Sequence, residues 1–232
     1  MFGNLMICII FLSVVFFSVM ITSIPFLLIT FIVYAFIREL RNLHGKSLMA
    51  YVLSLTCMYT ILVILGLHEN SLVENYNRTC RLLGYSLLGA IFMCFFWLNV
   101  MCLDIWMAFK GKGIRKDDTK FFKYCAYAFG TPCLLVLFIF ILSEFKIVPD
   151  DYGSGIGQHS CAVADQFDIE STGSGEVKKR QLIYVYAPIT IFIVINTIFY
   201  SVTACKIYRV QQETSIVKKG ESSRHAKKEQ AR

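Results

Sequence analysis

A cluster of polar and basic side chains stands between two long apolar segments of the chain. It lies in the stretch RELRNLHGKSL, which begins at Arg38, and we name its members Arg41, Asn42, His44 and Lys46 the basic cluster. Side chains of this kind attract anionic lipid headgroups or protein partners. Anchoring at a membrane surface accounts for Arg38 and Lys46. It accounts less well for the Asn-x-His spacing, so a more specific contact is the second interpretation.

Catalytic chemistry has no comparable candidate in the sequence. Histidine occurs four times, and each copy falls in a different segment. The chain contains no HExxH, CxxC, GxSxG or P-loop pattern, the usual signatures of metal, redox, hydrolase and nucleotide sites. We therefore expect no enzyme activity, no metal, no cofactor and no nucleic acid partner. The histidines are His44, His68, His159 and His225.

The composition is that of a membrane protein. Of the 232 residues, 56% are hydrophobic and only 17% are charged, whereas a soluble domain carries about 25% charge. Mean hydropathy is +0.58. The charges are concentrated in short segments that alternate with uncharged runs of helix length, which indicates a chain that crosses the bilayer several times.

These runs predict an all-α membrane protein with five transmembrane helices. A backbone in hydrocarbon must satisfy its own hydrogen bonds, and a helix does so within each span. The runs lack the period-2 alternation of barrel strands and are about twice as long. The predicted spans cover residues 16–37, 47–67, 82–109, 121–143 and 182–205.

Residues 1–15 extend the first apolar segment beyond what one span needs, because a span takes about 17 to 25 residues. This lead is either an extracellular extension or a signal-like segment, although it lacks the basic residues that open a secretory signal. Pro25, Pro132 and Pro188 fall inside predicted spans. They predict helix kinks, with functional hinges as the alternative.

The connecting segments differ in their content of Lys and Arg. Segments 38–46, 110–120 and 206–232 contain three, five and eight of them, whereas segments 68–81 and 144–181 contain two and four. Positive segments remain in the cytoplasm, so the first group is predicted to be inside and the second outside. We expect a plasma-membrane protein with its N-terminus outside and a basic, disordered cytoplasmic tail.

Two of the nine cysteines, Cys80 and Cys161, lie in segments that are predicted to be outside. An oxidising exterior allows thiols to pair, so we predict a disulfide between them, with two free thiols as the alternative. The NRT triplet at Asn77 is a glycosylation sequon on the same side, close to the membrane. The segment 144–181 is rich in Gly, Ser and acidic residues, and it is either a solvated loop or a cover for a ligand cavity.

Few polar side chains occur within the spans. Asn99 and Asn196 lie midway along the third and fifth spans, where an amide seeks a partner on another helix, a contact that contributes about 0.6 to 2 kcal/mol. Both are predicted to face the bundle interior, as helix–helix contacts or as ligand or switch contacts. Asp104, near the inner end of the third span, is either a functional ionisable residue or one that reaches the membrane surface.

Three longer stretches carry a family resemblance. They are FLLITFIVYAFIRELRNLHGKSLMAYVLSL from Phe26, CRLLGYSLLGAIFMCFFWLNVMCLDIWMAF from Cys80 and YVYAPITIFIVINTIFYSVTACKIYRV from Tyr184. RNLHGKSL and FFWLNV are the most specific strings. The stretches resemble the first two, the third and the fifth helices of Methuselah-like receptors, the insect branch of the secretin-like G-protein-coupled receptors. The resemblance covers about residues 21–209.

The resemblance implies a receptor with an extracellular peptide or protein ligand. Helix movement would open an inner cavity for a heterotrimeric G protein, and the basic cluster would lie near that cavity. Cys80 and Cys161 match the outer disulfide of the family. Trp97 matches a packing tryptophan at the bundle centre, and Pro188 and Asn196 match positions of the fifth helix.

The chain also departs from the family pattern. Secretin-like receptors usually carry a glutamate four residues after the tryptophan that Trp97 matches, within an inner polar lock, and here that position is Met101. The first acidic residue, Asp104, comes three residues later, and His44 is about one residue short of the usual lock histidine. We therefore expect a contact of Asp104 with Arg41 or with His44 in place of the usual lock.

The family has seven helices, and the sequence ends in the basic tail at the position of the third inner loop. We expect an incomplete bundle, without sixth and seventh helices or an extracellular domain, that is inert alone or acts by pairing with an intact receptor. A non-signalling five-span interaction protein is the first alternative. A transporter or channel is the second, although the spans hold few ionisable groups and no internal repeat.

Overall fold

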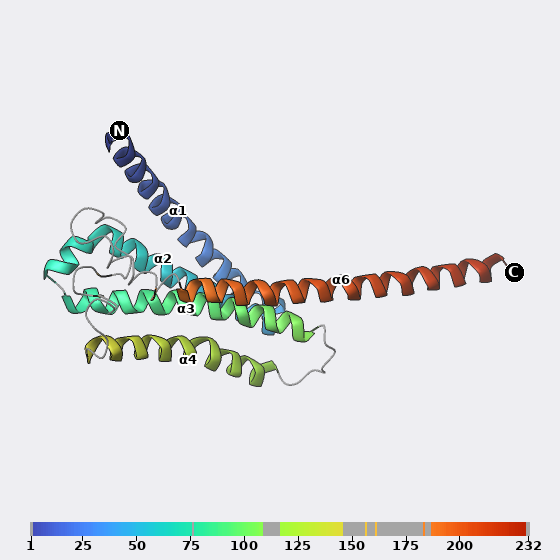
Figure 1. Cartoon of the computed structure of the whole chain (residues 1–232). Coiled ribbons are helices and arrows are strands. Elements are labelled where there is room, and N and C mark those ends of the chain that lie inside the picture. The colour runs from blue at the N-terminus through green and yellow to red at the C-terminus, as the bar shows by residue number, and fades with distance from the viewer. Residues whose placement is uncertain are drawn as a thin grey trace.

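The computed structural model describes residues 2–75, 77–108, 117–145, 156, 161, 183 and 187–230. Figure 1 shows α2, α3 and α4 running alongside one another, with α1 diverging toward the N-terminus and α6 projecting beyond the bundle toward the C-terminus. The elements in the described part are α1 (Phe2–Phe36), the short 3-10 helix η1 (Arg38–Leu40), α2 (Leu43–Asn75), α3 (Asn77–Ala108), α4 (Asp117–Glu144) and α6 (Ala187–Gln230).

Five helices of the described residues are long and apolar enough to cross a membrane. The predicted fold class, an all-α membrane protein with five spanning helices, is therefore confirmed. Residues 2–15 of the apolar lead belong to α1 and form one continuous helix with the first span. The candidate spans are Phe11–Phe36, Leu43–His68, Arg78–Met107, Thr119–Glu144 and Ala187–Ser215.

The helices extend further than predicted at two places. Segment 68–81, predicted as a loop, is almost wholly helical, because α2 ends at Asn75 and α3 begins at Asn77. It contains neither Gly nor Pro to interrupt the helices. The tail from residue 206, predicted to be disordered, continues α6 to Gln230. It contains no proline and many Lys, Glu and Gln residues, which favour helix.

The structure also bears on a predicted proline kink and on three predicted loops. Pro188 is the second described residue of α6 (Ala187–Gln230), and because residues 184–186 lie outside the described part, its predicted kink stays a prediction. Segment 38–46 is not entirely a loop, since it holds η1 and the first turn of α2. The predicted loops 110–120 and 144–181 lie mostly outside the described residues.

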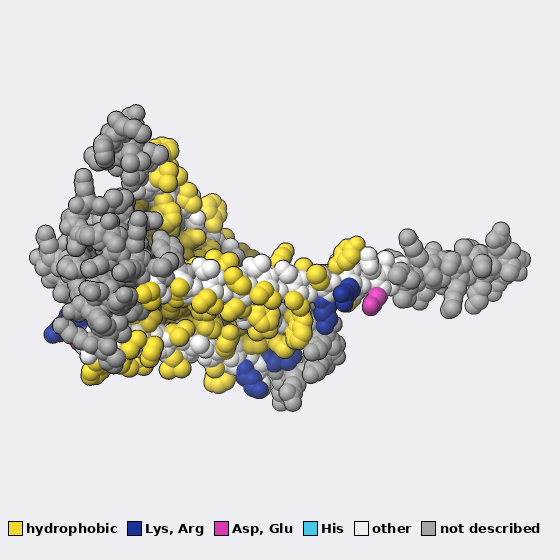
Figure 2. All heavy atoms as spheres, viewed as in Figure 1, with side chains coloured by type: hydrophobic (Ala, Val, Ile, Leu, Met, Phe, Trp, Pro, Cys, Tyr) yellow, Lys and Arg dark blue, Asp and Glu magenta, His cyan; other side chains and the backbone are white. Residues whose placement is uncertain are grey.

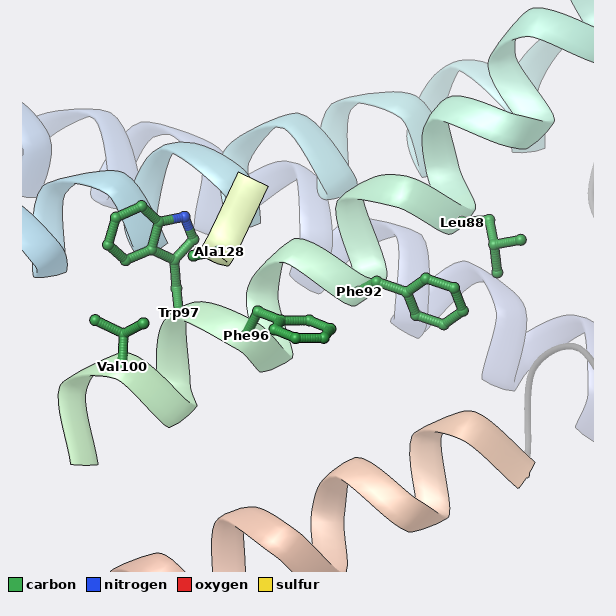
Figure 3. Packing of buried hydrophobic residues seen from close by; sticks show 6 residues of the cluster. All are labelled: Leu88, Phe92, Phe96, Trp97, Val100 and Ala128. Atoms are coloured by element: carbon green, nitrogen blue, oxygen red, sulfur yellow. The ribbon is translucent and has the colours of Figure 1, made fainter. Parts of the chain in front are cut away.

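Helix α3 is the centre of the bundle. In its apolar window 56% of the residues are buried, against 22% for α2, 11% for α4 and 6% for α1 and for α6. Four of its residues in the main core cluster, Leu88, Phe92, Phe96 and Val100, recur every fourth position and share one side of the helix, and Trp97 is next to Phe96. Figure 3 shows them together with their contact from α4: Leu88, Phe92, Phe96, Trp97, Val100 and Ala128.

Aromatic rings join α3 to its neighbours. The Trp97 indole is fully buried, and its centroid lies 5.3 Å from the ring of Phe129 in α4. From α6, the ring of Phe192 lies 5.7 Å from that of Phe92 and 5.1 Å from that of Phe96. Such ring pairs contribute about 0.5–1.5 kcal/mol each beyond the area they bury.

The outer faces of the bundle are strongly apolar. Figure 2 shows hydrophobic side chains covering much of the visible described surface. Phe26 of α1, Phe138 of α4 and Ile198 of α6 are 66%, 59% and 57% exposed. Continuous apolar surface of this extent is unusual for a soluble protein but suits contact with lipid chains.

A disulfide joins Cys80, in the first turn of α3, to Cys161, and both residues are buried. One turn further along α3, Gly84 lies directly against the backbone at Cys161. A Cβ atom at Gly84 would lie 1.9 Å from the carbonyl oxygen of Cys161. Glycine is therefore required there for Cys161 to lie against α3.

Gly84→Ala is expected to destabilise the protein by about 1–3 kcal/mol, because the added methyl group overlaps a backbone atom that the disulfide holds in place. Gly130→Ala in α4 is the matched control, since a Cβ there meets nothing within 4 Å. Thermal unfolding in detergent measures the difference. Equal Tm values for the two variants would contradict the close approach.

Candidate functional site

The basic cluster lies where the chain turns from α1 into α2. We call this end of the bundle the basic end; it also includes the C-terminal turns of α3 and the N-terminal turns of α4. Figure 2 shows visible Lys and Arg side chains gathered mainly toward this end. The opposite end, with the Cys80–Cys161 bond, is named the disulfide end.

Two residues of the cluster region have structural roles. The Asn42 side chain caps α2, because its Oδ1 accepts a hydrogen bond of 2.7 Å from the backbone N–H of Gly45. A Cβ atom at Gly45 would lie 1.9 Å from the carbonyl oxygen of Leu40, so glycine allows η1 to approach the helix. The spacing Asn-x-x-Gly thus forms the tight entry into α2.

Arg41 does not contact Asp104. Its guanidinium instead donates a hydrogen bond to the carbonyl oxygen of Ala35 at the end of α1. The last carbonyls of a helix have no partner within it and carry partial negative charge, so a cation is favourable there. Of the two partners predicted for Asp104, the structure brings only His44 to it.

Asp104 of α3 lies between α2 and α4 at the basic end. Its Oδ2 lies 3.8 Å from Nδ1 of His44 in α2. Its Oδ1 accepts a hydrogen bond of 3.1 Å from the hydroxyl of Tyr124 in α4. We name His44, Asp104 and Tyr124 the Asp104 cluster. One carboxylate thus links three helices.

The two contacts of Asp104 differ in strength. The His44 side chain is 45% exposed and attracts the carboxylate fully only when its ring is protonated; such exposed pairs contribute about 0–1 kcal/mol. The Tyr124 hydroxyl bonds to a carboxylate that is only 15% exposed, and hydrogen bonds to charged groups contribute about 1.5–3 kcal/mol. Tyr124 is therefore the stronger partner. Sequence reasoning missed it, although a phenol at the start of an apolar span signals a hydroxyl that needs a partner.

Cations lie over aromatic rings at the same end. Lys46 Nζ of α2 is 5.7 Å from the ring centroid of Phe121 in α4. Lys206 Nζ of α6 is 5.4 Å from the ring of Trp106 in α3. At such sites each contact contributes about 0.5–1 kcal/mol and leaves the ammonium group near the membrane surface.

The polar residues predicted for the bundle centre lie on or against α3. Asn99 is buried in α3. The amide of Asn196 in α6 donates a 3.3 Å hydrogen bond to the carbonyl oxygen of Phe95. Within the described part of the chain, Nε1 of Trp97 and Oδ1 of Asn196 are buried without a hydrogen-bond partner.

The other predicted positions are less informative. Asn77 is the first residue of α3, and its side chain lies outside the described residues. Among the described residues, no group of three or more His, Cys, Asp or Glu side chains is arranged to hold a metal ion.

Comparison with known proteins identifies the family. Residues 9–231 match the family model described as 7 transmembrane receptor (Secretin family). The chain is 33% identical over 190 residues to G-protein coupled receptor Mth2 of Drosophila simulans, which covers 81% of this chain and 33% of that protein. It is 32% identical over 190 residues to Probable G-protein coupled receptor Mth-like 10 of Drosophila melanogaster, again 81% of this chain and 30% of the relative.

The chain thus spans about a third of the length of the curated relatives it matches. The matched region includes all five candidate spans and both ends of α3. The chain belongs to the secretin family of seven-transmembrane receptors, within its Methuselah-like group.

Proposed function

We propose that the chain provides five helices of a receptor that binds an extracellular peptide or protein ligand. Together with the family's two further helices, it would signal to a heterotrimeric G protein. The observation that carries this proposal is the Asp104 cluster, because it joins α2, α3 and α4 at the end of the bundle where a G protein would bind.

The proposed orientation places the disulfide end outside the cell and the basic end in the cytoplasm. The count of Lys and Arg in the connecting segments supports it. The Cys80–Cys161 bond supports it as well, because disulfides persist in an oxidising exterior and are rare in the cytosol. The long α6 would then extend into the cytoplasm beyond Ser215.

The Asp104 cluster would act as the inner lock of this receptor. Asp104 lies three residues beyond Met101, about 4.5 Å further along the helix axis, and so nearer the basic end than the lock glutamate of the receptors it resembles. From there its carboxylate meets both His44 and Tyr124. Opening an inner cavity requires α2, α3 and α4 to separate at this end, which breaks these contacts.

A second candidate is a partner for an intact receptor. The apolar faces of α1 and α6 are the most exposed in the bundle, with only 6% of each span window buried. A receptor helix packed on these faces would form a homo- or hetero-oligomer without G-protein coupling by this chain. Lipid alone covers the same surfaces equally well, so the receptor proposal has the more specific support.

The lock predicts energetic coupling between Asp104 and Tyr124. Tyr124→Phe is expected to lower stability by about 1–3 kcal/mol, or roughly 3 °C or more in Tm. In an Asp104→Asn background, Tyr124→Phe should lower the free energy of unfolding much less. The difference is a coupling energy of about 0.5–3 kcal/mol in a double-mutant cycle. Thermal unfolding of the four proteins in detergent measures it.

Tyr127→Phe is the matched control for this cycle. Tyr127 is 41% exposed on the same helix, and its ring packs on Phe96, a contact that phenylalanine retains. It should show no coupling to Asp104. Additive effects of Asp104→Asn and Tyr124→Phe would contradict the lock.

Signalling is tested in a full bundle, formed by joining residues 1–209 to the part of the Drosophila simulans Mth2 receptor that follows its matching segment. Asp104→Lys should raise basal nucleotide exchange on a G protein by about fivefold or more, the effect of releasing a coupling of about 1 kcal/mol. Glu39→Gln, which removes an exposed acid of η1 at the same end, should leave it unchanged. Equal exchange by the Asp104→Lys variant and the parent would refute the proposed role.

A further inference from the structure

A groove of about 800 Å³ opens on the side of the bundle, between α2 and α4. Figure 1 shows these two helices on either side of α3, which forms the floor of the groove. The groove begins at the disulfide end and runs toward the middle of the bundle. The residues that line it include Arg78, Arg81, Tyr85, Gly89, Val136 and Phe140.

At the basic end, α2 and α4 lie close to each other. There Lys46 lies over Phe121, and Tyr51 packs against the cluster that contains Ala128. Toward the disulfide end, small residues of α3 form the floor: Ser86, Gly89 and Ala90. A Cβ atom at Gly89 would meet only a methyl group of Val136, at 3.6 Å, so a side chain at this position would project into available space.

The α3–α4 side of the groove is held by two contacts. The rings of Tyr85 and Phe140 meet edge to face with centroids 5.4 Å apart. Beyond them, the guanidinium of Arg81 donates to the carboxylate of Glu144 at 2.6 Å. These contacts set the spacing of the two helices, so the groove is a defined surface of the bundle.

Among the described residues, the charges at the mouth of the groove do not cancel. Glu144 neutralises Arg81, whereas Arg78 is exposed and has no ion-pair partner among the described residues. A guanidinium group binds phosphate through several N–H donors. Within the described part of the chain, the groove therefore combines one available cation at its mouth with an apolar interior.

We infer that this groove holds one membrane phospholipid, with its phosphate against Arg78 and one acyl chain along α3. From Arg78 to Met93 the groove extends about 22 Å at 1.5 Å per residue. One leaflet of hydrocarbon is about 15 Å thick, so this length reaches from headgroup level to beyond the bilayer centre. Its volume lies within the range of small-molecule sites. The site is independent of the Asp104 cluster, which lies at the other end of α3.

The inference is tested by native mass spectrometry. The full chain is purified in detergent that contains 16:0/18:1 phosphatidylglycerol and is released from that detergent in the spectrometer. The chain should retain one phospholipid. It should retain much less of the diacylglycerol that has the same acyl chains but lacks the phosphoglycerol headgroup. Arg78→Gln should lower the bound fraction about tenfold, the effect of losing one charge-assisted contact. Lys123→Gln, at the basic end of α4, should not change it.

A second pair of variants tests the groove itself. Gly89→Leu should fill the floor and lower phospholipid retention. Gly130→Leu adds the same side chain to α4, where a Cβ meets nothing within 4 Å, and should not. The inference would be overturned if the chain retained diacylglycerol as well as phospholipid, or if Arg78→Gln retained as much phospholipid as the wild type. It would also be overturned if Gly89→Leu and Gly130→Leu lost phospholipid equally. A dimer that Gly89→Leu dissociates would overturn it as well, because the occupant would then be a second copy of the chain.

Discussion

The packing of α3 among α2, α4 and α6 is the interaction on which the rest of the structure depends. Most of its apolar window is buried, and it supplies Leu88, Phe92, Phe96, Trp97 and Val100 to the main core cluster. Helices α4 and α6 turn most of their apolar surface outward, as expected where lipid replaces water around a bundle, whereas α2 also packs against α1. The arrangement therefore depends on side chains of α3 more than on those of any other helix.

The two ends of α3 are held by different chemistry. Near its start, Cys80 is bonded covalently to Cys161, and Gly84 allows the linked backbone to lie against the helix. Near its other end, Asp104 is held by polar contacts to His44 and Tyr124. A covalent bond does not open under thermal motion, whereas contacts of about 1–3 kcal/mol do. The polar contacts of Asp104 can therefore break and re-form, whereas Cys161 stays bonded to α3.

The sequence predicted the features that depend on composition and local pattern, and it missed those that depend on contacts across the bundle. The length of the apolar runs was enough to predict the five spans. The departure from the family pattern at Met101 was enough to predict that His44 lies near Asp104. Tyr124 was missed because its partner is 20 positions away on another helix. The roles of Gly45 and Gly84 follow from backbone atoms that only the folded chain brings close. The charge of the tail predicts disorder, whereas its Lys, Glu and Gln residues favour helix, so the sequence underestimates the length of α6.

In the proposed orientation, α3 crosses the bilayer with its disulfide end outside and Asp104 inside. The most direct measurement uses two forms of the chain in intact insect cells, one with a peptide epitope inserted after Ser154 and one with the same epitope after Arg232. In this orientation, antibody binds the first form on intact cells and the second form only after permeabilisation. Binding to both forms on intact cells would place the two positions on one side of the membrane and contradict it.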